Sequence, residues 1–75
     1  MKEIIIMDAK TIGATIKALR SQMNVTQEDL ATYTGLSRVG IVKLEKEEND
    51  PKFSSLIKIA KLLGFELVLR KRGSK

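Results

Sequence analysis

Two short helices joined by a tight turn are predicted between Thr26 and Glu45, and this pair constrains the fold more than any other part of the chain. The stretch reads TQEDLATYTGLSRVGIVKLE. Thr26 can cap the first helix together with Asp29, and Ser37 can cap the second. Isolated helices of about two or three turns are marginal in water, and Gly40 lowers the helical propensity of the second by a further ~1 kcal/mol. Other helices must therefore hold the pair in place.

Apolar and small residues in this stretch fall where a crossing of two helices needs them. Ala31 is small enough for a close crossing, and Gly35 suits a turn that requires a positive φ angle. The other apolar positions, which we expect to face the rest of the domain, are Leu30, Leu36, Ile41 and Leu44. The pattern is typical of a helix-turn-helix motif over residues 27–46, with helices at roughly 27–33 and 38–45.

Amphipathic helices are predicted on both sides of the motif. Between Asp8 and Met23 the apolar residues recur at helical spacing, at Ile12, Ile16, Leu19 and Met23. After the charged loop at 46–51, a second such helix starts at Ser54 and ends at Gly64, and its apolar face is formed by Leu56, Ile59, Ala60 and Leu63. These two helices are expected to cover the short pair.

Beyond Gly64 the apolar period changes from helical to alternating, which predicts a strand over residues 65–70. An isolated strand leaves its backbone donors and acceptors unpaired, so it requires a neighbour. The candidates are the N-terminal apolar run at residues 3–6, predicted as a second strand, and the same strand of a second chain, alone or together. A dimer would also supplement the thin core expected of a single domain over residues 1–75.

Composition restricts the chemistry that the chain can perform. It has no cysteine and no histidine, which excludes a disulfide framework, a thiolate metal site and a histidine base. Because no phosphate-binding glycine loop is present either, we expect no enzyme, no cofactor and no metal. The net charge of +5 favours a polyanionic partner. The apolar run before Asp8 is too short for a signal peptide or a membrane span, so a cytoplasmic protein without membrane attachment is expected.

The stretches TQEDLA, GLSRVGIVKLE and NDPKFSSLIKIAKLLG resemble the second, third and last helices of the lambda-repressor/Cro-like family, also called Xre-type regulators. The resemblance covers roughly residues 12–63 and implies a mostly α, lambda-repressor-like DNA-binding domain of four to five helices. It implies that the helix starting at Arg38 lies in the major groove of double-stranded DNA, and that Arg20 pairs with Glu45 as an internal brace. The implied function is transcriptional repression at a palindromic operator.

The outward side of that helix supplies the candidate base-reading residues. Arg38 and Lys43 are the basic candidates, since a guanidinium can bond guanine O6 and N7 together, while Val39 and Val42 suit thymine methyl groups. The alternative for the two valines is partial burial against the neighbouring loop, and Gly40 either allows close approach of the backbone to DNA or has no role. By the resemblance, Gln27 contacts a phosphate and braces this helix. Further candidate phosphate contacts, by position, are Ser37, Lys46, Asn49 and Lys52.

The C-terminal stretch GFELVLRKRG resembles HipB-type antitoxins, whose C-terminal strands pair across a dimer into a small intermolecular sheet. The resemblance implies an autoregulated operon, a HipA-like kinase-fold toxin as partner, and a homodimer held by Phe65, Leu67, Val68 and Leu69. The alternatives are a free-standing Xre-family or phage-type repressor without a toxin, and a module that binds only a protein. The outward basic residues argue against the last, because protein-binding grooves usually present aromatic or aliphatic anchors.

Overall fold

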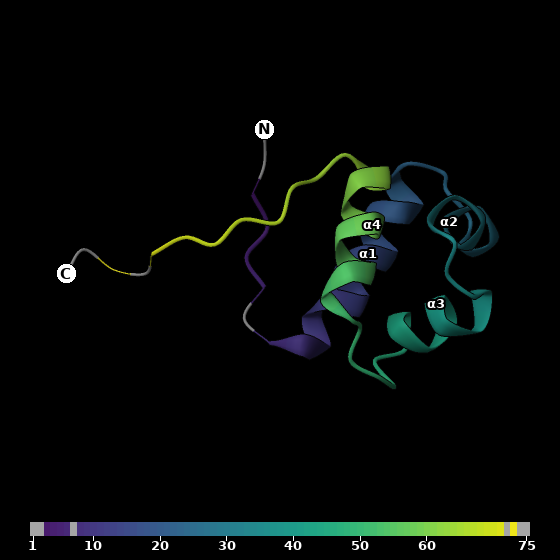
Figure 1. Cartoon of the computed structure of the whole chain (residues 1–75), viewed down its shortest axis with the longest axis horizontal. Helices are drawn as coiled ribbons and strands as arrows, with labels where there is room; N and C mark the ends of the chain where they lie inside the picture. The colour runs from purple at the N-terminus through teal and green to yellow at the C-terminus, as the bar shows by residue number, and fades with distance from the viewer. Residues whose placement is uncertain (1–2, 7, 72, 74–75) are drawn as a thin grey trace.

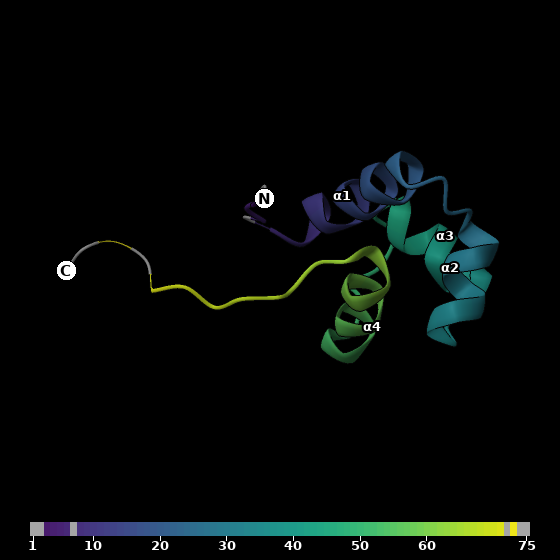
Figure 2. The same cartoon turned by 90° about the horizontal axis from the view of Figure 1, so that it is seen from above.

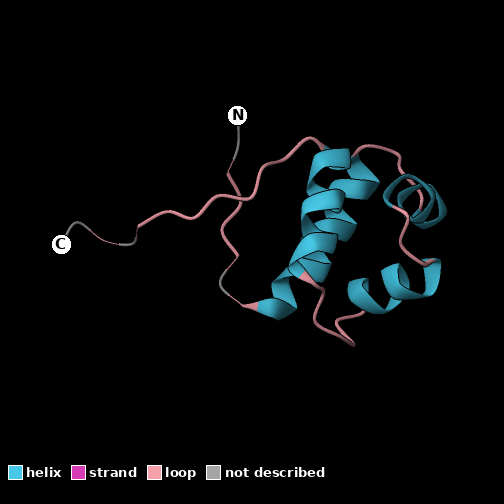
Figure 3. Cartoon of the chain, viewed as in Figure 1, coloured by secondary structure: helices cyan, strands magenta, loops and turns pink. Residues whose placement is uncertain are grey.

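Four helices form the folded part of the described chain (Figures 1 and 3). The computed structural model describes residues 3–6, 8–71 and 73. The helices are α1 (Ala9–Gln22), α2 (Gln27–Thr34), α3 (Arg38–Glu45) and α4 (Phe53–Leu63). α3 packs on both α1 and α2, while α4 packs on α2. The predicted mostly α architecture, with two short helices supported by the outer ones, is therefore confirmed.

The first three helices begin at the caps that the sequence predicts or allows. Asp8 accepts a hydrogen bond from the backbone N–H of Thr11 at 3.1 Å. In the capping box of α2, the Thr26 hydroxyl accepts from the Asp29 N–H at 2.9 Å, and the Asp29 carboxylate accepts from the Thr26 N–H at 3.1 Å. The Ser37 hydroxyl accepts from the Gly40 N–H at 2.9 Å. These bonds satisfy N–H groups that the first turn of a helix leaves without partners.

The start of α4 differs from the prediction by one residue. The helix begins at Phe53 rather than Ser54, and its N-cap position is occupied by Lys52, which makes no side-chain capping bond. The first turn is closed by the backbone hydrogen bond from the Leu56 N–H to the Lys52 carbonyl oxygen at 3.1 Å, so the helix starts without a capping hydroxyl. At its other end Gly64 adopts a φ angle of 81°, as expected for a glycine that terminates a helix.

A small core lies where the four helices meet. Its buried apolar members come from every helix and are Ile16, Leu30, Ala31, Ile41, Leu44, Ile59 and Leu63. All of them were predicted to face inward. Met23 was also predicted on the apolar face of the first helix, and this is wrong: its side chain is 47% exposed. Met23 lies one residue beyond α1, so the helical period no longer directs it toward the core.

Gly13 sets the distance between α1 and α3, a role that the sequence did not indicate. The residue is buried, and a β-carbon at this position would lie 2.1 Å from the backbone oxygen of Leu44. Real β-carbons do not approach other atoms so closely. The backbones of the two helices therefore touch at a site that only glycine permits.

The two ends of the chain run outside the helical body. Figures 1 and 2 show residues 65–71 extending away from α4, beyond the N-terminal segment. Phe65 packs against the core, whereas Leu67, Val68 and Leu69 are exposed. We call residues 65–69 the C-terminal apolar segment. Arg70, the residue after this segment, forms an ion pair with Glu3 of the N-terminal run, where Ile5 is also largely exposed.

Neither predicted strand is present within the described part of this single chain. Residues 3–6 and 65–70 lack ladder hydrogen bonds to each other, so pairing of the two ends inside one chain, one of the predicted options, does not occur there. Pairing with a second chain stays a prediction, because a strand is defined by a neighbour. Met7, the apolar residue that follows the N-terminal run and precedes Asp8, lies outside the described residues.

Candidate nucleic-acid interface

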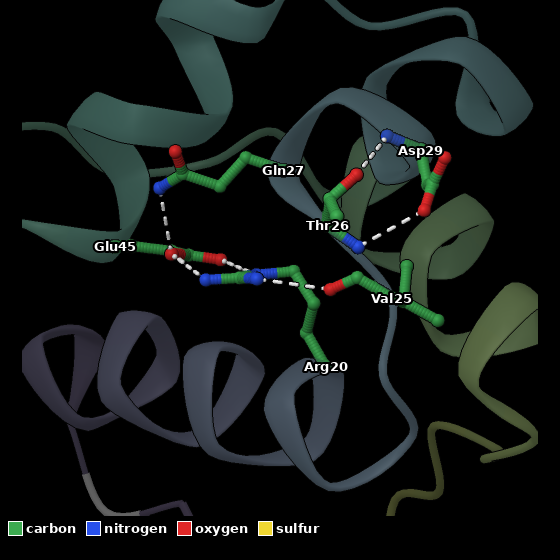
Figure 4. Close-up of polar contacts among 6 residues, drawn as sticks. All are labelled: Arg20, Val25, Thr26, Gln27, Asp29 and Glu45. Carbon is green, nitrogen blue, oxygen red and sulfur yellow. Dashed lines mark hydrogen bonds and ion pairs between the residues drawn. The ribbon is translucent and has the colours of Figure 1, made fainter.

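A polar network joins α1, α2 and α3 at the last residue of α3 (Figure 4). Arg20 donates from Nε to Glu45 Oε2 at 2.8 Å and from Nη2 to Glu45 Oε1 at 3.0 Å. Its third nitrogen, Nη1, donates to the carbonyl oxygen of Val25 at 2.9 Å. The Gln27 amide donates from Nε2 to Glu45 Oε1 at 3.0 Å. One carboxylate thus receives hydrogen bonds from two helices, while its guanidinium partner also holds the loop between them.

The Arg20–Glu45 pair is present, as the resemblance implied, with Glu45 buried and Arg20 largely buried. The two side chains are 13% and 2% exposed, respectively. The hydrogen bonds that Arg20 donates to Glu45 raise the pKa of Arg20 above its ordinary value, against the opposite effect of desolvation. Because a bidentate pair fixes both distance and plane, it sets the orientation of α3 relative to α1. The network therefore serves to hold α3, and neither member is available to a ligand.

α3 has one buried face and one exposed face. Ile41, Leu44 and Glu45 are buried. We call the opposite side, formed by Arg38, Val39 and Lys43, the outer face of α3; all three residues are exposed, and Val39 is 64% exposed. Val42 is half-buried, which matches the alternative considered for the valines rather than full exposure. The structure thus presents three of the four predicted base-reading side chains to solvent on one short helix.

The predicted phosphate contacts fall into two groups. Lys46, Asn49 and Lys52 are exposed on the loop that follows α3. Ser37 and Gln27 are partly engaged: the Ser37 oxygen caps α3, and the Gln27 amide nitrogen is bonded to Glu45. The bracing part of the role predicted for Gln27 is therefore present, and contact of any of these residues with phosphate stays a prediction.

Gly40 has a local role that neither sequence alternative considered. A β-carbon there would lie 3.0 Å from the Ser37 hydroxyl oxygen, which caps the helix. A side chain at this position would press on the capping group. The glycine therefore leaves room for the N-terminus of α3 to be capped.

An ion pair at the start of the two short helices was not predicted. Glu28 Oε1, in the first turn of α2, lies 4.0 Å from Arg38 Nη1, in the first turn of α3. The sequence shows both charges but not their proximity, because the turn between the helices determines whether their first turns come together.

Among the described residues, no cluster of three or more His, Cys, Asp or Glu side chains is placed to hold a metal ion. Within the same ranges, no helix has both the length and the apolar content needed to cross a bilayer. The features that suit a polyanionic ligand are the exposed basic side chains of α3 and of the loop after it, namely Arg38, Lys43, Lys46 and Lys52.

Comparison with known sequences identifies a family and several related proteins. The profile of the helix-turn-helix family HTH_3 matches residues 16–69, well over half of the chain. An uncharacterised HTH-type transcriptional regulator of Methanocaldococcus jannaschii, MJ0272, is 42% identical over 52 residues, which cover 69% of this chain and 79% of the relative. The control protein C.SmaI of Serratia marcescens is 36% identical over 76 aligned positions, which cover 97% of this chain and 90% of that protein.

Two solved structures share the fold. The P22 c2 repressor in complex with a synthetic operator superposes with a TM-score of 0.69 at 29% identity, covering 73% of this chain and 83% of that one. A chain of the HipA-HipB-O2-O3 complex gives a TM-score of 0.77 over 97% of this chain and 100% of its own length. Its identity is 20%, so this second likeness establishes a shared fold and no more.

Proposed function

The chain belongs to the helix-turn-helix family HTH_3, the Xre-type transcriptional regulators, and on that premise we propose that it is a sequence-specific repressor that places α3 in the major groove of a palindromic operator. The observation that carries the proposal is the division of α3 into an anchored face and an exposed one. A helix fixed at its far end by Glu45 can present its first turns to base edges without disturbing the domain. The P22 c2 repressor, which has this fold, was solved in complex with an operator.

Base reading is assigned to the outer face of α3 together with Val42. Arg38 is proposed to donate two hydrogen bonds to guanine O6 and N7, while Lys43 reaches a neighbouring acceptor and the valines contact thymine methyl groups. Phosphate contacts are assigned to Gln27, Ser37, Lys46, Asn49 and Lys52, which would fix the register of the domain on the duplex.

Selection of binding sites from a random double-stranded library tests this proposal. A dimer of such domains should enrich an inverted repeat whose half-sites are centred about one helical turn, roughly 34 Å, apart. Enrichment of no sequence, with affinity set only by salt, would identify the chain as a general DNA-binding protein and contradict the proposal.

Substitutions at Arg38 and Lys46 separate base reading from phosphate binding. Arg38→Ala should cost roughly 1–3 kcal/mol on the selected site and relax the preference at one base pair of each half-site. Lys46→Ala should weaken binding to the selected site and to random DNA by the same factor. The measurement is a titration of both DNAs with each variant. Equal losses on both DNAs for both variants would remove α3 from the base-reading role.

The C-terminal apolar segment is proposed as the dimer interface. In one chain Leu67, Val68 and Leu69 remain exposed, and the backbone of residues 65–70 has no ladder partner among the described residues. Antiparallel pairing with the same segment of a second chain would satisfy that backbone and cover the apolar side chains. Phe65 contributes less than predicted, because it already packs against its own core.

Ending the chain at Phe65 should therefore yield a monomer while keeping the contact of Phe65 with the core. Sedimentation reports the oligomeric state, and affinity for the selected operator should fall at least about tenfold, since the two half-sites are then bound independently. Leu67→Asp combined with Leu69→Asp in the full chain should have the same effect. A dimer that survives both changes would place the interface elsewhere, with α4 the next surface to test.

The repressor acts either with a toxin partner or, as the alternative, without one. A HipB-like antitoxin that binds a HipA-like kinase-fold toxin is favoured by the C-terminal apolar segment, whose sequence resembles that of HipB-type antitoxins. A free-standing repressor without a toxin is favoured by the 36% identity to the control protein C.SmaI over nearly the whole chain. Co-purification of the chain with the product of an adjacent gene separates them: a kinase-fold partner supports the antitoxin, whereas a dimer that purifies without a partner supports the free-standing repressor.

A further inference from the structure

The ion pair between Glu28 and Arg38 places a negative charge against the first residue of the proposed reading helix. The closest oxygen and nitrogen are 4.0 Å apart, and the side chains are 77% and 64% exposed. Both residues line a shallow depression beside the Arg20–Gln27 part of the polar network. The backbone at Glu28 is held close to α3, because its neighbour Gln27 is bonded to the last residue of α3.

Glu28 is not needed to start α2. The capping box of that helix is completed by Thr26 and Asp29, and the Glu28 carboxylate makes no hydrogen bond to a described residue. A carboxylate beside the outer face of α3 also repels phosphate, so it opposes the general attraction that the +5 chain has for DNA. A carboxylate in the first turn of α2 interacts favourably with the dipole of that helix, but this interaction requires no partner in α3. The placement of Glu28 next to Arg38 therefore points to a role at the outer face of α3.

We propose that Glu28 is a specificity-determining residue that keeps Arg38 from binding phosphates on non-cognate DNA and holds it in place for guanine in the operator. This inference rests on the proposed function. A guanidinium carries five N–H groups, so Arg38 can bond guanine O6 and N7 with two of them and keep its ion pair with Glu28. The operator complex then does not lose the pair. A phosphate contact would draw Arg38 away from Glu28, and it gains no more than the exposed ion pair that it breaks.

Glu28→Gln tests the proposal, because it removes the charge and keeps the size of an exposed side chain. Affinity is measured on the selected operator and on random DNA across a range of salt concentrations. On random DNA the affinity should rise about two- to fivefold, which corresponds to the strength of an exposed ion pair. The slope of log affinity against log salt should steepen by about 0.9, because the released Arg38 neutralises one more phosphate. Operator affinity should change by less than about twofold, so the specificity ratio falls.

A double-mutant cycle separates this role from simple repulsion. If the proposal holds, Arg38→Ala alone leaves the salt slope on random DNA unchanged, and Arg38→Ala added to Glu28→Gln removes the extra slope. Repulsion alone would instead give equal gains on both DNAs, and these gains would persist without Arg38; that result overturns the proposal. Glu48→Gln, an exposed charge removed from the loop after α3, is the matched control and should leave the specificity ratio unchanged.

The same experiment distinguishes failure of this inference from failure of the proposed function. A selected operator whose specificity ratio is insensitive to Glu28→Gln refutes the role of Glu28 and leaves the repressor proposal intact. Failure of the wild-type chain to select any sequence refutes both.

Discussion

Glu45→Ala should lower the free energy of unfolding by about 3–5 kcal/mol, the usual cost of removing one partner from a buried ion pair. The Arg20 side chain is only 13% exposed, so its charge would stay largely shielded from water. It would lose two of its three acceptors and keep only the Val25 carbonyl. The Gln27 amide would lose its acceptor as well. Thermal or urea unfolding measures the loss.

Three further variants make the effect of Glu45 interpretable. Glu48→Ala removes an exposed carboxylate and should change stability by no more than about 0.5 kcal/mol. Glu45→Gln keeps the shape and one acceptor and should fall between wild type and Glu45→Ala. Arg20→Met combined with Glu45→Leu should recover much of the loss, because a buried pair can often be replaced by apolar groups of similar volume. A melt of Glu45→Ala that matches wild type would show that the pair contributes nothing.

The parts of the fold that were predicted correctly are those encoded by neighbouring residues. The capping box of α2 depends on Thr26 and Asp29, and the bounds of α3 follow from Ser37 and its apolar period. Such signals act within one or two turns of helix, so they can be read without knowing the rest of the fold. The buried positions follow from the same periodicity. Among the apolar positions that were predicted to face inward, Met23 alone is exposed, since it lies just past the end of its helix.

Contacts between elements that are distant in the chain could be predicted only from the family resemblance, and some of them could not be predicted at all. The Arg20–Glu45 pair came from the resemblance, and the structure confirms it. No local pattern distinguishes Gly13 from a tolerated glycine in a helix, or Glu28 from any solvent-exposed acid. The C-terminal strand illustrates a different limit, because alternation predicts an extended chain but does not identify the partner that would complete a sheet.

Gly13→Ala should destabilise the domain by about 1–2 kcal/mol or more, although helix propensity alone predicts a gain of about 1 kcal/mol. The sign follows from the atom that the new methyl group meets. That atom is the backbone oxygen of Leu44, 2.1 Å from the position of the β-carbon. A side chain can rotate away, but a main-chain carbonyl inside α3 moves only with its helix. α1 and α3 must then separate, which disrupts the packing of Ile16, Ile41 and Leu44 around them.

Gly40→Ala provides the matched control, because it is the same substitution inside a helix of the same domain. Its nearest neighbour is the Ser37 hydroxyl oxygen at 3.0 Å, the end of a rotatable side chain. The gain in propensity and the weakened cap, each about 1 kcal/mol, should nearly cancel.

Urea unfolding of the two variants therefore separates close backbone approach from the general effect of removing a helical glycine. Equal or increased stability of Gly13→Ala would mean that the α1–α3 contact yields at little cost. If instead only Gly13→Ala loses stability, the contact between the two backbones is what positions α3, and operator affinity measured well below the melting temperature should fall with it.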